Sequence, residues 1–320
     1  KNIINLIVKD EDKVQRVDVF IKNKEDSLSR TRIKNLILKK KLTLNNVVLE
    51  DPSKKVTPGD ILKLEIPEPI KTTLNPYNYK LDIIYEDDDL LVINKSAGIS
   101  MHPGAGNYDN TIVNALMNYC GGNLSTIGDE LRPGIVHRID KETSGLLIIA
   151  RTYKSSVYLS KKFKDKNIEK FYLAILNGIP KKTNGIIISK IKDKKNKDAV
   201  TKYIVLKKIK KRFSFVLLKP ETGRKRQIRE HCFELGCPIL GDKKYFKKLE
   251  QNKNIDSNKL FLHAYKLKII KKDGIKEEFT AALPDHIRKF CYLYKIPINE
   301  TFINKFVISN ILKGAKELKN

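Results

Sequence analysis

The chain has 320 residues, of which 41% are hydrophobic, so it can bury the core of one large domain or of two smaller ones. It contains no apolar run near the roughly 18–20 residues of a membrane-spanning helix, and its first residues do not resemble a signal peptide. Its four cysteines form no CxxC pair, which argues against a disulfide framework and a zinc ribbon. We therefore expect a cytoplasmic protein without membrane contact, metal or cofactor.

The charge balance is strongly basic. Lysine and arginine number 64 against 37 acidic residues, which gives a net charge of +27 and an isoelectric point of about 9.7. This surplus predicts a polyanionic partner, either a nucleic acid or an anionic membrane face, although a lysine-rich solvated surface encoded by an AT-rich genome gives the same balance. The 11 arginines are more informative because each offers a bidentate fork that lysine lacks. They cluster at Arg30 and Arg32, at Arg132 and Arg138, and within Arg224–Arg229.

Residues 1–66 are predicted to form a first, small domain. Apolar residues recur at helical spacing over residues 17–21, and Ser29 suits the N-cap of a second helix. Asn45 and Asn46 separate two short β-rich runs, which predicts a hairpin because asparagine tolerates the positive φ of tight turns.

The second predicted helix opens with Ser29-Arg30-Thr31-Arg32 and has one strongly basic face. Over residues 14–66 this helix, the hairpin and the closing turn resemble an S4 RNA-binding domain. Such a basic face can also serve solubility alone. The residues that the resemblance implies as RNA contacts are Ser29, Arg30, Arg32 and Lys34.

Residues 67–78 are predicted to be a linker because they contain three prolines and little periodicity. Residues 79–298 have the pattern of an α+β domain, and residues 299–320 that of a C-terminal amphipathic helix and tail. Helices are expected near 156–166 and 225–235. The β-rich runs are Leu90–Asn94, Gly145–Ala150, Phe171–Asn177, Gly185–Lys190, Val200–Lys207 and Phe213–Lys219. Because regular helices do not separate these runs, a doubly wound parallel sheet is disfavoured.

The segment from His137 to Leu147 holds the densest group of reactive side chains. Two strand-like apolar pieces bracket a polar loop that contains Asp140. A loop between core strands can hold a side chain rigidly at a cleft, as a nucleophile or a general base requires. Considered alone, Asp140 is better explained as a turn residue that caps Thr143 or Ser144.

The run His137-Arg138-Ile139-Asp140-Lys141 with Thr143-Ser144-Gly145 resembles the signature of the RluA/RluD-type pseudouridine synthases. Other motifs of that family lie on both sides of this run, over about residues 80–285, and occur in the order found in the family. They are Leu90–Lys95, Lys170–Ala174, Lys197–Tyr203, Thr222–His231, Gly236–Asp242 and Leu262–Ala264. The resemblance implies an α+β chain with a small S4 domain and a mixed, mainly antiparallel catalytic sheet. It also implies an isomerase that converts uridine in RNA to pseudouridine without a cofactor.

The resemblance implies Asp140 as the catalytic aspartate, Arg229 as its ion-pair partner and Tyr172 as the ring stacked on a flipped uracil. A carboxylate can act either as a nucleophile or as a base at the sugar, and the residues leave both roles open. The other implied contacts to the RNA, including the side chain that fills the gap left by the flipped base, are His137, Arg138, Arg224 and Arg226.

The run His102–Asn107 resembles the D-type branch of the family. This resemblance implies 23S rRNA as the substrate, either free or in an assembling large subunit. We expect the protein to be a monomer. Three alternatives stay open: a C-type 23S or a tRNA enzyme, a small-subunit-type enzyme, and a non-catalytic RNA-binding assembly factor. Small-subunit enzymes carry Gly-Arg-Leu-Asp where this chain has His137-Arg138-Ile139-Asp140, and a non-catalytic factor need not keep Asp140, Tyr172 and Arg229 together.

Overall fold

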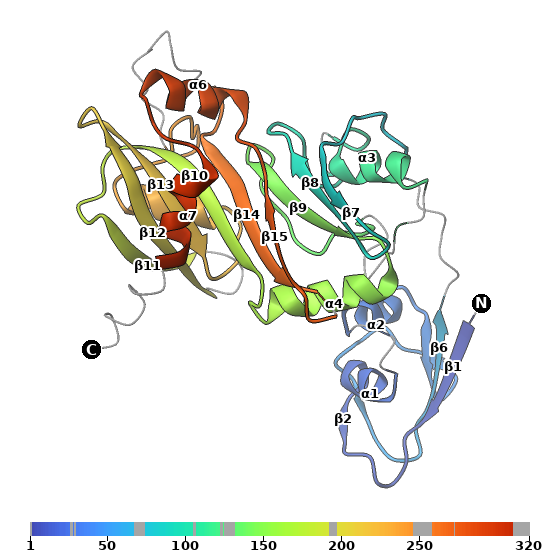
Figure 1. Cartoon of the computed structure of the whole chain (residues 1–320). Coiled ribbons are helices and arrows are strands. Elements are labelled where there is room, and N and C mark those ends of the chain that lie inside the picture. Colours follow the sequence, from blue (N-terminus) through green and yellow to red (C-terminus); the bar gives the residue numbers. More distant parts are fainter. Residues whose placement is uncertain are drawn as a thin grey trace. The chain divides into compact units, whose positions relative to one another are not determined.

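The computed structural model describes residues 2–25, 28, 30–66, 74–104, 107–121, 124, 132–191, 197–245, 258–271 and 273–309. The chain divides into two compact units. The first holds the described residues up to Leu74 together with Arg132 and Pro133, and the second holds the others from Asn75 onward. Both units combine helices with a sheet (Figure 1), which confirms the expected α+β class.

The first unit is built on a four-stranded antiparallel sheet. In spatial order its strands are β1 (Asn2–Ile7), β6 (Ile61–Ile66), β3 (Leu42–Leu44) and β4 (Val47–Val48). Two short strands, β2 (Gln15–Arg16) and β5 (Lys55–Val56), pair separately. Its helices are α1 (Val17–Lys24) and α2 (Arg30–Leu38).

Local sequence signals of the first unit are confirmed. Phe20 and Ile21 of α1 are fully buried in one apolar core with Ile33 and Ile37 of α2. The hairpin between β3 and β4 turns at the two asparagines, Asn45 and Asn46, whose φ angles are 50° and 67°. Helix periodicity and turn chemistry are sufficient to specify these elements.

The second unit is built on a nine-stranded mixed sheet. In spatial order its strands are β11 (Asn184–Ile191), β12 (Lys197–Ile209), β13 (Phe213–Pro220), β10 (Glu169–Asn177), β14 (Leu262–Ile270), β9 (Ser144–Ala150), β8 (Leu90–Lys95) and β7 (Ile83–Glu86). A ninth strand, β15 (Lys276–Thr280), pairs with β14. Only β9 and β14 run parallel among the described pairings, so the sheet is mainly antiparallel, as expected.

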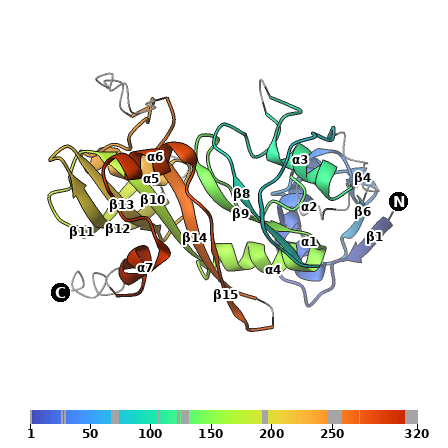
Figure 2. The same ribbon diagram turned by 45° about the horizontal axis from the view of Figure 1, so that its top comes forward.

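In the described part of the second unit, five helices pack on this sheet. They are α3 (Ile112–Tyr119), α4 (Tyr153–Lys164), α5 (Gln227–Glu234), α6 (Asp285–Leu293) and α7 (Glu300–Ser309). Alternate residues of β8 and β9 face two different cores, one shared with α3 and the other with α4. Helices α5, α6 and α7 share a third core with β10, β12 and β13 (Figure 2). Within the described ranges, no helix has the length and apolarity needed to cross a bilayer.

The parallel contact between β9 and β14 depends on a glycine. Gly145 pairs with Ala264 at a φ of +114°, and a Cβ atom placed on it would lie 2.3 Å from the Ala264 carbonyl oxygen. Only glycine allows the two backbones to approach this closely. The loop that carries Asp140 ends at this contact, so the close approach fixes where that loop enters the sheet.

Candidate functional site

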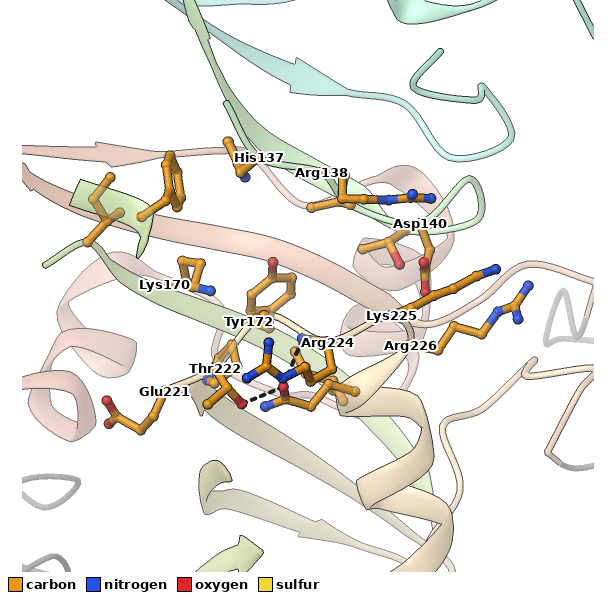
Figure 3. Close-up of a pocket in the computed structure, with 18 of the residues that line it drawn as sticks. His137, Arg138, Asp140, Lys170, Tyr172, Glu221, Thr222, Arg224, Lys225 and Arg226 are labelled. Carbon is orange, nitrogen blue, oxygen red and sulfur yellow. Dashed lines mark hydrogen bonds between the residues drawn. The ribbon is translucent and has the colours of Figure 1, made fainter. Parts of the chain in front are cut away.

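A cavity of about 610 Å³ opens in the second unit. Its walls come from the loop before β9, from β10 and from the loop that leads into α5 (Figure 3). The structure brings together here all seven residues of the second unit that the sequence singles out. They are His137, Arg138, Asp140, Tyr172, Arg224, Arg226 and Arg229.

The loop of Asp140 is held by a buried lysine. Lys95, which is 1% exposed, donates hydrogen bonds from its Nζ to the carbonyl oxygens of Ser96, Ile99 and Lys141 at 2.7, 3.1 and 3.0 Å. The N–H of Thr143 donates to the main-chain carbonyl of Asp140 at 3.0 Å. The backbone closes this turn, and the Asp140 carboxylate faces Arg229.

Arg229 is held mainly by a second carboxylate. Its Nε and Nη2 donate to the two oxygens of the buried Asp242, both at 2.7 Å, whereas its Nη1 lies 3.7 Å from Oδ2 of Asp140. The structure places Arg229 beside Asp140, its expected ion-pair partner, but joins the two by a single long contact. The fork faces Asp242, because α5 and the Gly241-Asp242 turn lie against each other while Asp140 meets only the remaining Nη1.

Asp242 is itself strongly hydrogen-bonded. Its Oδ1 also accepts from the backbone N–H groups of Lys244 and Tyr245 at 3.0 and 3.3 Å. Burial opposes the charge on Arg229, but the hydrogen bonds and the charge of Asp242 outweigh it and raise the pKa of Arg229. The guanidinium is therefore a fixed positive charge next to Asp140.

Tyr172 lies on β10 where its pairing with β14 shifts register, between Phe171 and Tyr172. Such an irregularity redirects a side chain, and here the Tyr172 ring lies in the middle of the cavity (Figure 3). Burial, with a smaller contribution from the Asp140 carboxylate, raises the pKa of the Tyr172 phenol. The ring therefore keeps its hydroxyl proton at neutral pH.

His137 has structural contacts in the cavity wall. Its ring stacks on Phe163 with centroids 4.4 Å apart, and its Nε2 accepts the backbone N–H of Ile148 at 2.8 Å. Burial, helped by the charge of Lys170, lowers the pKa of His137 to about 3, so the ring is neutral. Its neighbour Arg138 is exposed and extends along the rim of the cavity.

His137→Ala is expected to lower the free energy of unfolding by at least about 1 kcal/mol, because it leaves the buried Ile148 N–H without an acceptor. Urea unfolding of the full chain measures this effect. The matched control is Arg138→Ala, which changes the adjacent exposed residue and should leave stability within about 0.5 kcal/mol of wild type. Equal stability of the two variants would contradict the structural role of His137.

A glutamine fixes the loop that leads into α5. The Oε1 of Gln227 accepts from Thr222 Oγ1 at 2.6 Å and from the Arg224 N–H at 3.0 Å, while its Nε2 donates to the Val200 carbonyl at 2.9 Å. Arg226, the residue before α5, takes a left-handed conformation with a φ of 58°. Figure 3 shows the Arg224 guanidinium beneath the Tyr172 ring and Arg226 extending away from it.

The basic face of α2 in the first unit is tied to a buried carboxylate. Asp18 accepts from Nε of Arg16 at 3.1 Å and Nε of Arg30 at 3.0 Å, and Nζ of Lys34 lies 3.7 Å from it. Burial alone would raise the pKa of Asp18, but the hydrogen bonds from Arg30 and Arg16 outweigh burial, so the pKa lies below its ordinary value. Arg30 and Lys34 remain about half exposed and available to a ligand. Ser29 and the side chain of Arg32 lie outside the described residues.

Sequence reasoning missed Lys95, Asp242 and Gln227 as parts of this site. Each lies in a motif that carries the resemblance or next to one, so a signal was present, but only the folded chain shows what each side chain contacts. In the described ranges, no three His, Cys, Asp or Glu side chains gather as a metal site would require.

Comparison with known proteins identifies both units. The family model described as RNA pseudouridylate synthase matches residues 89–234, and the S4 domain model matches residues 15–62. The chain is 36% identical over 291 residues to the ribosomal large subunit pseudouridine synthase D of Zymomonas mobilis, which covers 85% of this chain and 92% of the relative.

Another relative and one solved structure agree with these matches. The uncharacterized RNA pseudouridine synthase YlyB of Bacillus subtilis is 36% identical over 296 residues, covering 89% of this chain and 95% of its own. The structure of human RNA pseudouridylate synthase domain containing 4 superposes with a TM-score of 0.54 at 25% identity. That superposition covers 67% of this chain and 93% of the human one.

Proposed function

Because the chain belongs to the RNA pseudouridine synthases and carries an S4 domain, we propose that it isomerises specific uridines of 23S rRNA, with Asp140 as the catalytic aspartate. One observation above all supports this assignment. The Asp140 carboxylate, the fixed Arg229 guanidinium and the Tyr172 ring share one cavity that is open to solvent.

In this mechanism the target uridine leaves the RNA stack and enters the cavity. Tyr172 stacks on the uracil, and the exposed Arg138 at the rim fills the gap in the RNA. The Arg229 guanidinium lies beside the Asp140 carboxylate and orients it toward the sugar. Asp140 then acts at the sugar, either as a nucleophile or as a base, while the bond from C1′ moves from N1 to C5 of the uracil.

The choice of 23S rRNA is supported by the relatives and by the charge. The Zymomonas mobilis relative is a large-subunit enzyme by name, and the net charge of +27 suits a polyanionic partner. All four cysteines are free thiols, which fits a monomer in the reducing cytoplasm. Other 23S sites, tRNA and a purely RNA-binding role in ribosome assembly are the competing proposals.

The direct test uses transcripts of 23S rRNA, 16S rRNA and tRNA that carry uridine tritiated at C5, since isomerisation releases that tritium. Tritium release from the 23S transcript alone is the expected result. Release from tRNA alone would overturn the substrate, and binding to 23S rRNA without any release would favour the assembly factor.

Deleting residues 1–74 is expected to weaken binding to a 23S rRNA fragment by at least about tenfold, because it removes the S4 unit and its phosphate contacts. The deletion spares Asn75 and Tyr77, whose backbones hydrogen bond the side chain and the backbone of Asn114 in α3. The single-turnover rate at saturating RNA should stay within about twofold of wild type. A lower rate at saturation would show that the first unit takes part in the chemistry.

A further inference from the structure

Lys170 is a charged residue of the cavity wall to which the proposed mechanism gives no role. It lies on β10 two residues before Tyr172, and both side chains line the cavity. Burial lowers the pKa of Lys170, and the Glu221 carboxylate only partly offsets this. In the described part of the chain, the Lys170 ammonium makes neither a hydrogen bond nor an ion pair.

A second unpartnered donor lies beside it. The Nε of Arg224 is buried and has no hydrogen-bond acceptor among the described residues. A Cβ atom placed on the adjacent Gly223 would lie 3.7 Å from Nζ of Lys170, so this loop and Lys170 are neighbours. Figure 3 shows Lys170 on one side of the Tyr172 ring, Asp140 on the other and the Arg224 guanidinium beneath the ring.

The Glu221 carboxylate, which acts on Lys170 electrostatically, is shared with two other lysines. Glu221 has its Oε1 3.0 Å from Nζ of Lys202 and 3.9 Å from Nζ of Lys219. His137, also near Lys170, is neutral. Two cationic side chains therefore face this end of the cavity without an ion-pair partner among the described residues, which is costly unless a ligand completes the site.

We infer that Lys170 and Arg224 form an anion-binding subsite that receives negative charge of the RNA substrate at the end of the cavity remote from Asp140. This inference rests on the proposed function. The charge can come from a phosphodiester next to the target uridine. It can also come from the uracil, if the N1–C1′ bond breaks with its electron pair on the ring. In that case the C5–C1′ bond then forms, C5 loses its proton and N1 gains one.

Lys170→Met tests the subsite, with Lys161→Met as the matched control, because Lys161 is exposed on α4 and does not line the cavity. If the ligand is a phosphodiester, Lys170→Met should weaken binding of a 23S rRNA fragment at least about fivefold and reduce the salt slope by about one. If it is the uracil, affinity should hold while the single-turnover rate falls at least about tenfold. Lys170→Arg should restore most of either loss.

Thermal unfolding separates this role from a structural one. Lys170→Met removes an uncompensated, partly buried charge, so its unfolding midpoint should equal or exceed that of wild type. A lowered midpoint, or affinity and rate no worse than in Lys161→Met, would overturn the subsite. If wild type releases no tritium from any RNA, the proposed isomerase function fails. Binding affinity and salt slope then decide the subsite, and unchanged values would reject it too.

Discussion

Asp140→Asn is expected to lower the single-turnover rate of uridine isomerisation at least about 1000-fold, which corresponds to about 4 kcal/mol of barrier. The amide has the shape of the carboxylate but cannot act as an anionic nucleophile or base. The fold should survive, because the turn around Asp140 is closed by backbone groups and by Lys95, and Arg229 keeps its fork to Asp242. The measurement is tritium release at saturating RNA.

The control for Asp140→Asn is RNA binding in the same buffer. Affinity should change less than about threefold, because binding depends mainly on phosphate contacts elsewhere. A variant that keeps more than about one thousandth of the wild-type rate would remove Asp140 from the catalytic role. Lost binding together with lost turnover would instead make Asp140 a residue of the RNA interface.

Arg229→Lys is expected to slow the single-turnover reaction at least about tenfold, or about 1.4 kcal/mol of barrier, while RNA affinity changes less than about threefold. A lysine cannot donate two parallel bonds to Asp242 and also face Asp140, so the positive charge moves away from the catalytic carboxylate. Arg212→Lys, on the exposed turn between β12 and β13, is the matched control and should react at the wild-type rate.

A variant of Asp242 tests the role of Arg229 in a second way. Because Asp242 holds the guanidinium that faces Asp140, Asp242→Asn should slow the reaction as well, although Asp242 has no place in the chemistry. It should also destabilise the fold by about 3–5 kcal/mol, since it leaves a buried guanidinium without its counter-charge.

An Arg229→Lys variant that binds RNA more weakly but reacts normally at saturation would show that Arg229 contacts phosphate.

Local signals in the sequence predicted much of the fold. Periodicity located α1 and α4 to within a few residues, and all six β-rich runs of the catalytic region are strands. Strands β7, β14 and β15 of this region were missed. Lys266 of β14 is buried and pairs with Glu278 of β15 and Glu300 of α7, so a charge interrupts the apolar pattern that would have revealed the strand. Such long-range pairing is invisible to periodicity.

The candidate site, like the fold, could be predicted from the sequence only in part. Asp140, Tyr172 and Arg229 were found through the resemblance, and the structure places them in one cavity. Their spacing along the chain did not predict this contact, because β14, from far downstream, lies between β9 and β10. The Asp242 carboxylate that fixes Arg229 was missed for the same reason, since only the folded chain brings it to α5.

The most direct test of the account maps pseudouridines in 23S rRNA, 16S rRNA and tRNA by carbodiimide treatment and reverse transcription. The RNA comes from four strains. One carries the gene and one lacks it, and in the other two the deleted gene is replaced by a copy that encodes either the wild-type protein or Asp140→Asn. We expect defined 23S pseudouridines to vanish when the gene is deleted and to return with the wild-type protein but not with Asp140→Asn. Unchanged 23S pseudouridines in the deletion strain, or their return with Asp140→Asn, would contradict this expectation.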